Sequence, residues 1–272
     1  RPAKDTCEQC HWPEKSHGNV EIIYTHFKSD RKNTPYSARM LLHVNRPTPE
    51  KPDGGIHWHA NRNNRVEYFA TDPDRQEIPW VRVTNVKTGE SREFRTEEFK
   101  GEPPAGGLRT MDCLDCHNRP AHEFVNPERA VDRMMAAGQL PASLPLFRKA
   151  SLEVLKGDYA QGSAQSAIPA KLLAYYQKNQ PALYTAHQAE LQTASQQLVA
   201  LYERNIFPAM NVKWGSYPQH IGHTDSPGCF RCHGDELKST TPGKAITQDC
   251  DACHKVIGVE EKNMKALQEL GG

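Results

Sequence analysis

The segment Cys7-Glu8-Gln9-Cys10-His11 has the pattern Cys-x-x-Cys-His, and this pattern occurs four times in the chain. The four copies contain every cysteine of the sequence: Cys7, Cys10 and His11; Cys113, Cys116 and His117; Cys229, Cys232 and His233; Cys250, Cys253 and His254. This spacing is the attachment signature of a c-type haem, in which both thiols bond to the porphyrin and the adjoining histidine ligates the iron. The sequence therefore predicts four covalently bound haem c groups.

A zinc site is the competing interpretation of paired cysteines. Seventeen residues separate Cys232 from Cys250, which is within the range of a four-cysteine zinc ribbon. A zinc ribbon gives no reason for a histidine after each pair, and neither does a structural disulfide. Histidine makes up 13 of the 272 residues, so its presence after all four pairs has a chance probability on the order of one in 10⁵. The histidines therefore favour haem.

The composition agrees with a core that is partly cofactor. Hydrophobic residues make up 37% of the chain, whereas about 45–50% is usual for a globular domain. A net charge of +1, and 20 prolines that punctuate short ordered runs, argue against disorder. Each porphyrin brings a large apolar surface, so we expect the apoprotein to fold poorly.

Charge and hydropathy limit the partners of the chain. Nucleic-acid binding calls for a concentrated basic surface, which a net charge of +1 does not suggest. No run of eighteen apolar residues exists, so we predict no membrane span. Haem c is attached outside the cytoplasm, and no signal peptide is visible. We therefore expect a periplasmic or extracellular protein whose targeting segment has been removed or lies outside this sequence.

Local patterns predict an α+β fold dominated by haem, with short antiparallel strands in the N-terminal third, helices in the middle and irregular haem-binding loops. Runs of branched and aromatic residues predict strands at residues 20–27, 37–44, 56–59, 66–70, 80–86 and 92–99, with a hairpin turn at 87–90. Helical periodicity and capping residues predict helices at 127–138, 143–156, 169–178, 181–205 and 259–270.

The same patterns predict five segments along the chain. These are a first haem segment at 1–19, a β-rich section at 20–100, a second haem segment at 101–126, a helical section at 127–207, and a segment with the third and fourth haem sites at 208–272. Only the last segment holds two motifs, so its two haems are expected to be close neighbours.

The second axial ligand of each iron decides the chemistry. An iron between two histidines is saturated and passes electrons, whereas an open position can bind a substrate. Nine histidines lie outside the motifs, and four are needed: His17, His26, His43, His57, His59, His122, His187, His220 and His223. The surplus favours four closed irons. Arg119 and Arg231, beside the motifs, are interpreted either as partners of haem propionates or as solvated charges.

Local sequence favours some of these histidines as distal ligands. His57 and His59 alternate on a predicted strand and would share one face. His122 follows His117 by only five residues, which is too short to reach round its own porphyrin, so we assign it to a different haem. His223 lies in a loop next to a glycine, which permits close approach to a cofactor. The remaining candidate, His26, ends the first predicted strand, whereas the other four histidines are interpreted as surface or core residues.

Several segments together resemble the NapC/NirT-type multihaem cytochromes c, and the likeness extends over most of the chain. The segments are CEQCHWPEK at 7–15, GIHWH at 55–59, IPWV at 78–81, MDCLDCHNRPAH at 111–122, and IGHTD at 221–225 followed by CFRCH at 229–233. The resemblance implies bis-histidine haems and electron transfer outside the cytoplasmic membrane. On matching positions it favours His26, His57 or His59, His122 and His223 as distal ligands.

Such proteins generally carry an N-terminal membrane anchor and further upstream haem motifs where quinol is oxidised. This sequence contains neither, so we do not expect quinol oxidation by this polypeptide alone. The leading hypothesis is a tetrahaem electron carrier without catalytic residues, whose partners are other redox proteins or copies of itself in a conducting filament. The alternatives are a reductase of a small oxyanion with one open haem, the soluble part of a quinol dehydrogenase with a membrane-anchored partner or upstream segment, and a zinc-bound structural module.

Overall fold

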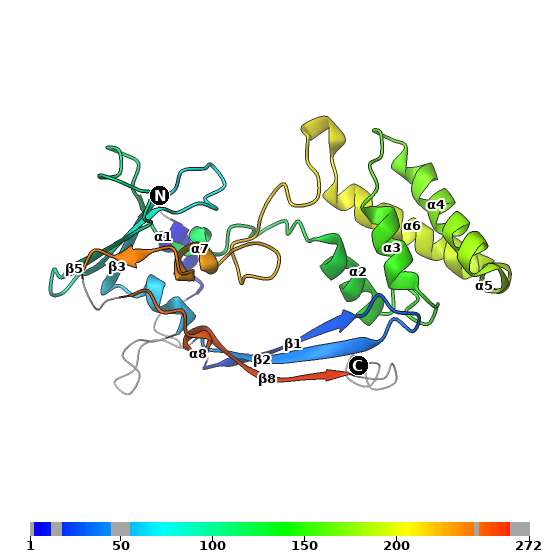
Figure 1. Ribbon diagram of the computed structural model, residues 1–272, viewed down its shortest axis with the longest axis horizontal. Helices are drawn as coiled ribbons and strands as arrows, with labels where there is room; N and C mark the ends of the chain where they lie inside the picture. The colour runs from blue at the N-terminus through cyan, green and yellow to red at the C-terminus, as the bar shows by residue number, and fades with distance from the viewer. Residues whose placement is uncertain (1–2, 12–17, 45–54, 242–244, 262–272) are drawn as a thin grey trace. The chain divides into compact units, whose positions relative to one another are not determined.

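The computed structural model describes residues 3–11, 18–44, 55–241 and 245–261. Its contacts divide the chain into two units (Figure 1). The first, here called the motif unit, comprises Arg1–Ile22, Met40–Glu123 and Tyr217–Val256, and it contains all four Cys-x-x-Cys-His motifs. The second, the helical unit, comprises Ile23–Arg39, Phe124–Ser216 and Ile257–Gly272. The predicted α+β class is confirmed, because helices and antiparallel strands are both present.

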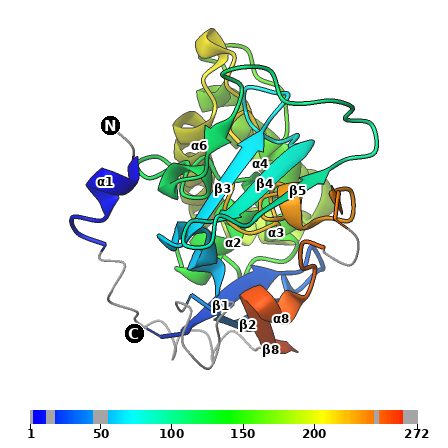
Figure 2. The same ribbon diagram turned by 90° about the vertical axis from the view of Figure 1, so that its left-hand side faces the viewer.

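The motif unit is built on a five-stranded antiparallel sheet (Figure 2). Its strands follow the order β6-β3-β4-β5-β7, with bounds β3 Asn64–Phe69, β4 Trp80–Asn85, β5 Ser91–Arg95, β6 Arg109–Thr110 and β7 Lys238–Ser239. The predicted hairpin turn joins β4 to β5, and Gly89 takes a φ of +74° there, which glycine adopts without strain. The sheet buries a small apolar cluster of Val66, Tyr68, Ile78, Val81, Phe94 and Leu237.

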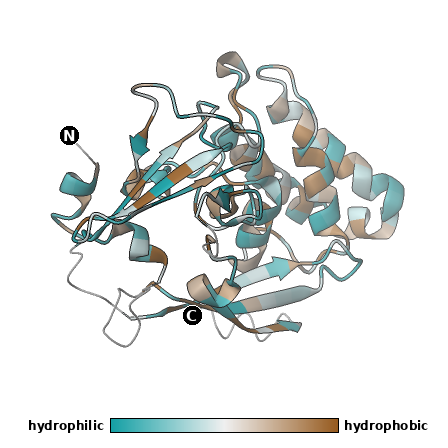
Figure 3. Ribbon diagram, turned by 60° about the vertical axis from the view of Figure 1, so that its left-hand side comes forward, coloured by the Kyte–Doolittle hydropathy of each residue, from teal (hydrophilic) through white to brown (hydrophobic). Residues whose placement is uncertain are grey.

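The helical unit has a larger core. Its helices are α2 Pro127–Ala136, α3 Phe147–Leu155, α4 Ala164–Asn179, α5 Pro181–Ala186 and α6 Gln188–Asn205. Helix α4 packs along α6, and α3 contacts α2, α4 and α6 (Figure 1). Apolar and polar residues alternate around these helices, as Figure 3 shows, which is the pattern of helices with one buried face. The most deeply buried side chains are Phe147, Leu155, Ile168, Leu172, Tyr176, Leu191 and Leu198.

The remaining elements are a second sheet and several single helical turns. A three-stranded sheet has the order β1-β2-β8, with β1 Val20–Phe27, β2 Pro35–Leu42 and β8 His254–Glu261. Single turns of helix are α1 Ala3–Cys7, η1 Ile56–Ala60, η2 Cys113–Asp115, η3 Pro208–Met210, α7 Phe230–His233 and α8 Cys250–Cys253. Among the residues that the structure describes, no helix has the length and apolar character needed to cross a bilayer.

Residues 56–59 form the 3-10 turn η1, so the prediction of a strand there is wrong. The backbone N–H of Trp58 donates to the carbonyl of Gly55 at 2.8 Å, and that of Asn61 donates to Trp58 at 3.2 Å. These bonds over three residues satisfy the backbone without a neighbouring strand. Because a 3-10 helix has three residues per turn, His57 and His59 lie about 240° apart around its axis. They therefore do not share a face.

Several helix predictions need correction, and the helix predicted at 143–156 begins instead at Phe147. The helix predicted at 181–205 is divided into α5 and α6 at His187, whose backbone leaves the helical region at φ −124° and ψ 29°. The His187 ring lies 2.9 Å from the Glu190 carboxylate, which stabilises this new helix start. The helix predicted to begin at Pro169 instead begins at Ala164, because burying Ala164 and Ile168 against the core favours helix before the proline.

The predicted helix at 259–270 is wrong in its first three residues, which belong to strand β8. Strand pairing with β2 satisfies the backbone groups there. Residues 262–270 of that prediction lie outside the described residues.

A core substitution tests this architecture. The Leu198 side chain is fully buried in α6, so Leu198→Ala should lower the free energy of unfolding by about 2–5 kcal/mol. The matched change Gln197→Ala affects an exposed neighbour on the same helix and should cost less than about 0.5 kcal/mol. Chemical denaturation followed by far-ultraviolet circular dichroism measures both. Equal losses in the two variants would contradict the placement of Leu198 in the core.

Candidate functional site

The four motifs, numbered first to fourth in chain order, share one local conformation. In each of them the backbone N–H of the histidine donates to the carbonyl of the first cysteine, four residues earlier. The bonds run from His11 to Cys7 and from His117 to Cys113, both at 2.8 Å, from His233 to Cys229 at 3.0 Å, and from His254 to Cys250. One helical turn therefore brings two thiols and an imidazole together, which explains why the spacing of the motif is fixed.

Carboxylates cap two of these turns. In the second motif Asp112 accepts from the backbone N–H of Leu114 at 2.9 Å, while Asp115 accepts from the backbone N–H of Asp112 at 2.7 Å. In the fourth motif Asp249 accepts from the backbone N–H of Asp251 at 3.0 Å. These caps satisfy donors at the start of a helix that have no partner within it.

The first three motifs contact one another in chain order. Turn α1 packs against η2. Burial raises the pKa of the Cys113 thiol, and the neighbouring Cys7 thiol, to which it is hydrogen-bonded, raises it further. Between the second and third motifs, the Arg231 guanidinium donates through Nη2 to the carbonyl of Asp115 at 2.9 Å.

The third and fourth motifs are joined by the segment between them. The Nδ1 atom of His233 donates to the carbonyl of Thr247 at 2.7 Å, and Nε2 of Gln248 donates to the carbonyl of Gly234 at 2.8 Å. The quoted contacts therefore join the first motif to the second, the second to the third, and the third to the residues that directly precede the fourth.

Turn η1 places one histidine opposite the second motif and another opposite the third. The rings of His57 and His117 have centroids 6.5 Å apart and planes inclined by 23°. The rings of His59 and His233 have centroids 5.8 Å apart, with planes nearly perpendicular at 83°. The two histidines of η1 thus face different motifs, in agreement with their different directions on the turn.

His223 faces the fourth motif. Its ring centroid lies 5.9 Å from that of His254, with planes inclined by 31°, and it stacks on Phe230 at 4.4 Å. The loop that holds His223 closes on itself, because the backbone N–H of Cys229 donates to the carbonyl of Gly222 at 2.9 Å. A Cβ atom at Gly228 would overlap that carbonyl, so this closure requires glycine.

These separations fit an iron between two imidazoles. A metal–imidazole bond is about 2 Å long, so two rings on opposite sides of one metal have centroids roughly 6 Å apart. The Nδ1 atoms of His57 and His59 donate to the carbonyls of Val44 at 3.1 Å and Ile56 at 3.0 Å, which leaves Nε2 for a metal. Burial lowers the pKa of His59, and the neutral imidazole it favours is the form that binds metals.

The thiols suit a thioether better than a zinc ion. Burial raises the pKa of Cys116 to about 11 and that of Cys232 to about 12. Zinc is bound by thiolates, whereas the sulfur of a thioether carries no charge. All eight cysteines are free of disulfides. No group of three or more His, Cys, Asp or Glu side chains within the described part of the chain is arranged to hold a metal ion alone. The residues present therefore fit haem.

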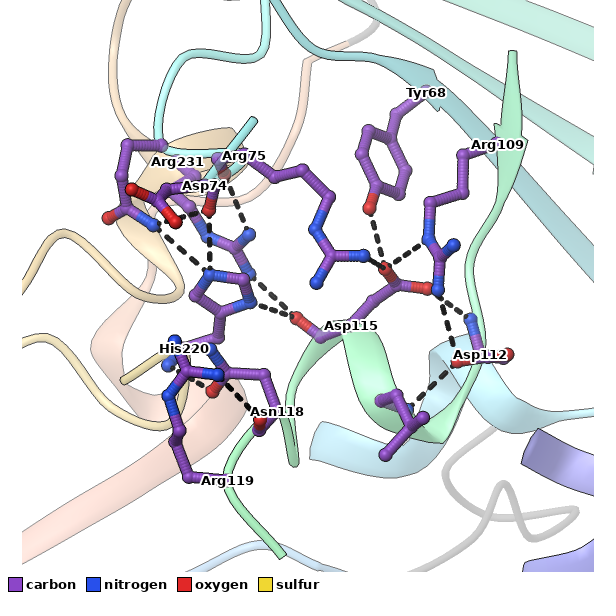
Figure 4. A network of polar contacts seen from close by, with 12 residues as sticks. Tyr68, Asp74, Arg75, Arg109, Asp112, Asp115, Asn118, Arg119, His220 and Arg231 are labelled. Atoms are coloured by element: carbon purple, nitrogen blue, oxygen red, sulfur yellow. Dashed lines mark hydrogen bonds and ion pairs between the residues drawn. The ribbon is translucent and has the colours of Figure 1, made fainter. Parts of the chain in front are cut away.

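A buried carboxylate fixes the second motif to the sheet (Figure 4). Asp115, which is 1% exposed, accepts through Oδ1 from the Tyr68 hydroxyl at 2.6 Å, from Arg109 Nε at 2.6 Å and from Arg75 Nη1 at 3.2 Å. Burial and the Asp115 carboxylate raise the pKa of Tyr68, so its hydroxyl keeps the proton that it donates. A charged group buried this deeply requires such partners.

His220 supports the same region without a ligand role. It is 2% exposed, and its Nδ1 donates to the carbonyl of Asp115 at 2.9 Å. Its Nε2 lies 3.0 Å from Gln76 Nε2 and 3.1 Å from the carbonyl of Asp74. Both ring nitrogens are engaged by the protein, so neither is left for a metal (Figure 4).

The other histidines are placed apart from these ring pairs. His26 belongs to the helical unit, where Nδ1 lies 3.4 Å from Asp132. His122 is exposed in irregular chain after the second motif. His43 contacts the fourth motif through its backbone N–H, which donates to the carbonyl of Cys253 at 2.8 Å. His187 occupies the N-cap position of α6, where its ring contacts Glu190, and His17 lies outside the described residues. The assignment of His26 and His122 as ligands stays a prediction.

Sequence reasoning missed the Asp115 network. The position of Asp115 between two motif cysteines is visible in the sequence, but its partners Tyr68, Arg75 and Arg109 come from other strands and loops. Arg75 has a left-handed backbone with φ +55°, which no sequence pattern indicated. The only available signal was the presence of a carboxylate inside a motif that must pack against porphyrin.

Comparison with known proteins supports the class of protein that this site defines. The chain is similar to a c-type cytochrome, which supports covalently bound haem c, a haem-based role in electron transfer and export from the cytoplasm. This relative is the cytochrome c-type protein ImcH of Geobacter sulfurreducens, with 41% identity over 269 residues. The match covers 97% of this chain and 52% of the relative, so the chain spans about half of the relative's length. No protein-family model and no solved structure matches.

Removal of one hydroxyl tests the network. Tyr68→Phe should lower the free energy of unfolding of the motif unit by about 1.5–3 kcal/mol, because a hydrogen bond to a charged group is lost. Tyr176→Phe is the matched control, since that buried hydroxyl donates to the neutral carbonyl of Pro145 at 2.9 Å and should contribute about 1 kcal/mol. Denaturation followed by Soret absorbance for the first variant and by circular dichroism for the second measures both. A loss for Tyr68→Phe no larger than that for Tyr176→Phe would contradict the role of Asp115.

Proposed function

We propose that the chain is a tetrahaem electron carrier whose four haem sites form one row in the order of the motifs. The observation that supports the proposal is the set of three imidazole pairs, each of which contains one motif histidine. In each pair the distance between the ring centroids is close to that expected for two rings on opposite sides of one metal ion. Bound haem would supply an iron that gains or loses one electron. The chain would accept an electron from a reduced partner and pass it to an oxidised partner. No covalent bond of the chain would form or break.

The chain's own residues hold each site closed. We assign His57 to the second site, His59 to the third and His223 to the fourth, each opposite its motif histidine. His122 is proposed for the first site, because the first and second motifs are in contact while His43 lies at the fourth. The structure gives His26 a carboxylate partner within the helical unit instead. Fixed histidines on both sides limit rearrangement during electron transfer, which favours rapid transfer.

The three ring pairs also argue against the reductase alternative. A reductase needs an iron with an open sixth position beside proton donors, whereas a histidine faces the motif histidine at three of the four sites. We further propose a location in the periplasm or outside the cell, with other redox proteins or further copies of the chain as partners. The narrower NapC/NirT-type resemblance is consistent with this proposal, which does not include quinol oxidation.

Haem content and spin state test the proposed function. The intact mass of the exported protein should show four covalently attached haems, and the denatured band should stain for haem. In the oxidised protein, electron paramagnetic resonance should show only low-spin iron. The near-perpendicular rings of the third site should give a strongly anisotropic signal, and the near-parallel rings of the second and fourth should give rhombic signals. Colourless protein would establish a zinc module, and a high-spin signal would favour a reductase.

Single substitutions test the ligand assignment. His59→Ala should open one site, so that one of four haems becomes high-spin in the oxidised protein and binds carbon monoxide when reduced. The lost low-spin signal should be the strongly anisotropic one, whereas His57→Ala should remove a rhombic signal. His187→Ala, which changes an exposed histidine of the helical unit, should leave all four haems low-spin. Retention of four low-spin haems in His59→Ala would overturn the assignment.

A further inference from the structure

Arg231 stands between the two cysteines of the third motif, and all three of its guanidinium nitrogens are in use. Nε donates to the carbonyl of Gly228 at 2.8 Å. Nη1 donates to the carbonyl of Arg75 and Nη2 to that of Asp115, both at 2.9 Å (Figure 4). The last of these carbonyls lies between the two cysteines of the second motif. One side chain therefore connects the cysteine segments of two neighbouring haem sites.

The positive charge of Arg231 has no counter-ion among the described residues. Its three partners are neutral carbonyls, and no ion pair joins it to a described carboxylate. The nearest buried carboxylate, that of Asp115, is already paired with Arg75 at 3.2 Å and Arg109 at 2.6 Å. The guanidinium is half-buried, so solvent screens its charge less than at an open surface.

The field of this charge reaches both motifs. Arg231 directly precedes Cys232 of the third motif. Its Nη2 donates at 2.9 Å to the carbonyl of Asp115, which directly precedes Cys116 of the second motif. The positive charge thus lies beside the cysteine segments that would attach two haems.

We propose that Arg231 is a positioning residue that holds the second and third haem sites in fixed register and raises the reduction potentials of both. The proposal rests on the proposed function. Reduction of a ferric site removes one positive charge, so a fixed cation beside the site favours the reduced form. The same argument predicts little effect on the first and fourth sites, because Arg231 is not bonded to either of those motifs.

Turn η1 joins the same two sites from the opposite side. His57 and His59 are separated by a single residue and face the second and third motifs, respectively. The two sites are therefore linked on the distal side by one helical turn and on the cysteine side by one guanidinium. This double link makes them a structural pair at the centre of the row.

Spectroelectrochemical titration of the complete haem-loaded chain tests the proposal. In Arg231→Gln, which removes the charge, two of the four midpoint potentials should fall while the other two stay at their original values. One of the two should belong to the strongly anisotropic signal of the third site. In Arg231→Lys, which keeps the charge but lacks the planar fork, the potentials should stay close to the original. Arg92→Gln is the control, since Arg92 pairs with Glu90 at 2.7 Å on the β5 hairpin and should affect none of them.

Unchanged potentials in Arg231→Gln with four attached haems would overturn the proposal, and so would a fall in Arg231→Lys equal to that in Arg231→Gln. If Arg231→Gln loses haem, the Arg231→Lys titration decides alone, because a fall of two potentials there would show that the charge is not the cause. Failure of the proposed function is seen separately, as fewer than four haems or as high-spin iron in the unaltered protein.

Discussion

The motif unit depends on the burial of the Asp115 carboxylate. A charged group that is 1% exposed carries a desolvation cost of several kcal/mol, which only well-placed donors offset. Tyr68 and Arg109 approach from strands of the sheet, Arg75 from a loop, and the backbone of Asp112 from the motif itself. Because Asp115 lies inside the second motif, the same contacts that neutralise its charge fix the two cysteines and the histidine against the sheet. Loss of the Asp115 carboxylate would leave the partly buried Arg75 without the carboxylate that it pairs with among the described residues.

The two units stabilise themselves by different means. The large apolar core of the helical unit accounts for its stability. The motif unit buries only a small apolar cluster beneath its sheet and relies on polar contacts between segments far apart in sequence. The small size of this cluster is understandable if porphyrin surface completes the packing around the partly buried cysteines. Haem binding and folding of this unit are then coupled, in the way known for other small domains built around a cofactor.

Sequence reasoning succeeded where the chemistry is local. The β4–β5 hairpin and the α+β class follow from short-range patterns, and the structure confirms both. The prediction of a strand at residues 56–59 rests on a short run of branched and aromatic residues and is wrong, because hydrogen bonds between residues i and i+3 satisfy the backbone there instead. The Asp115 cluster could not be predicted, because it joins residues that are distant in sequence. It also includes Arg75, whose backbone is in the left-handed region. The ring pairs of His57 and His59 could not be predicted either, because they depend on how turn η1 is positioned against the second and third motifs.

The local turn of each motif has a consequence for biogenesis. Since its defining hydrogen bond spans only four residues, the turn can form in a nascent polypeptide that has no tertiary contacts. The thiols of Cys116 and Cys232, in contrast, become shielded from solvent once the surrounding segments assemble. Bond formation at these two sulfurs would therefore be easier before the surrounding segments assemble than after, while the turn that presents them is already available.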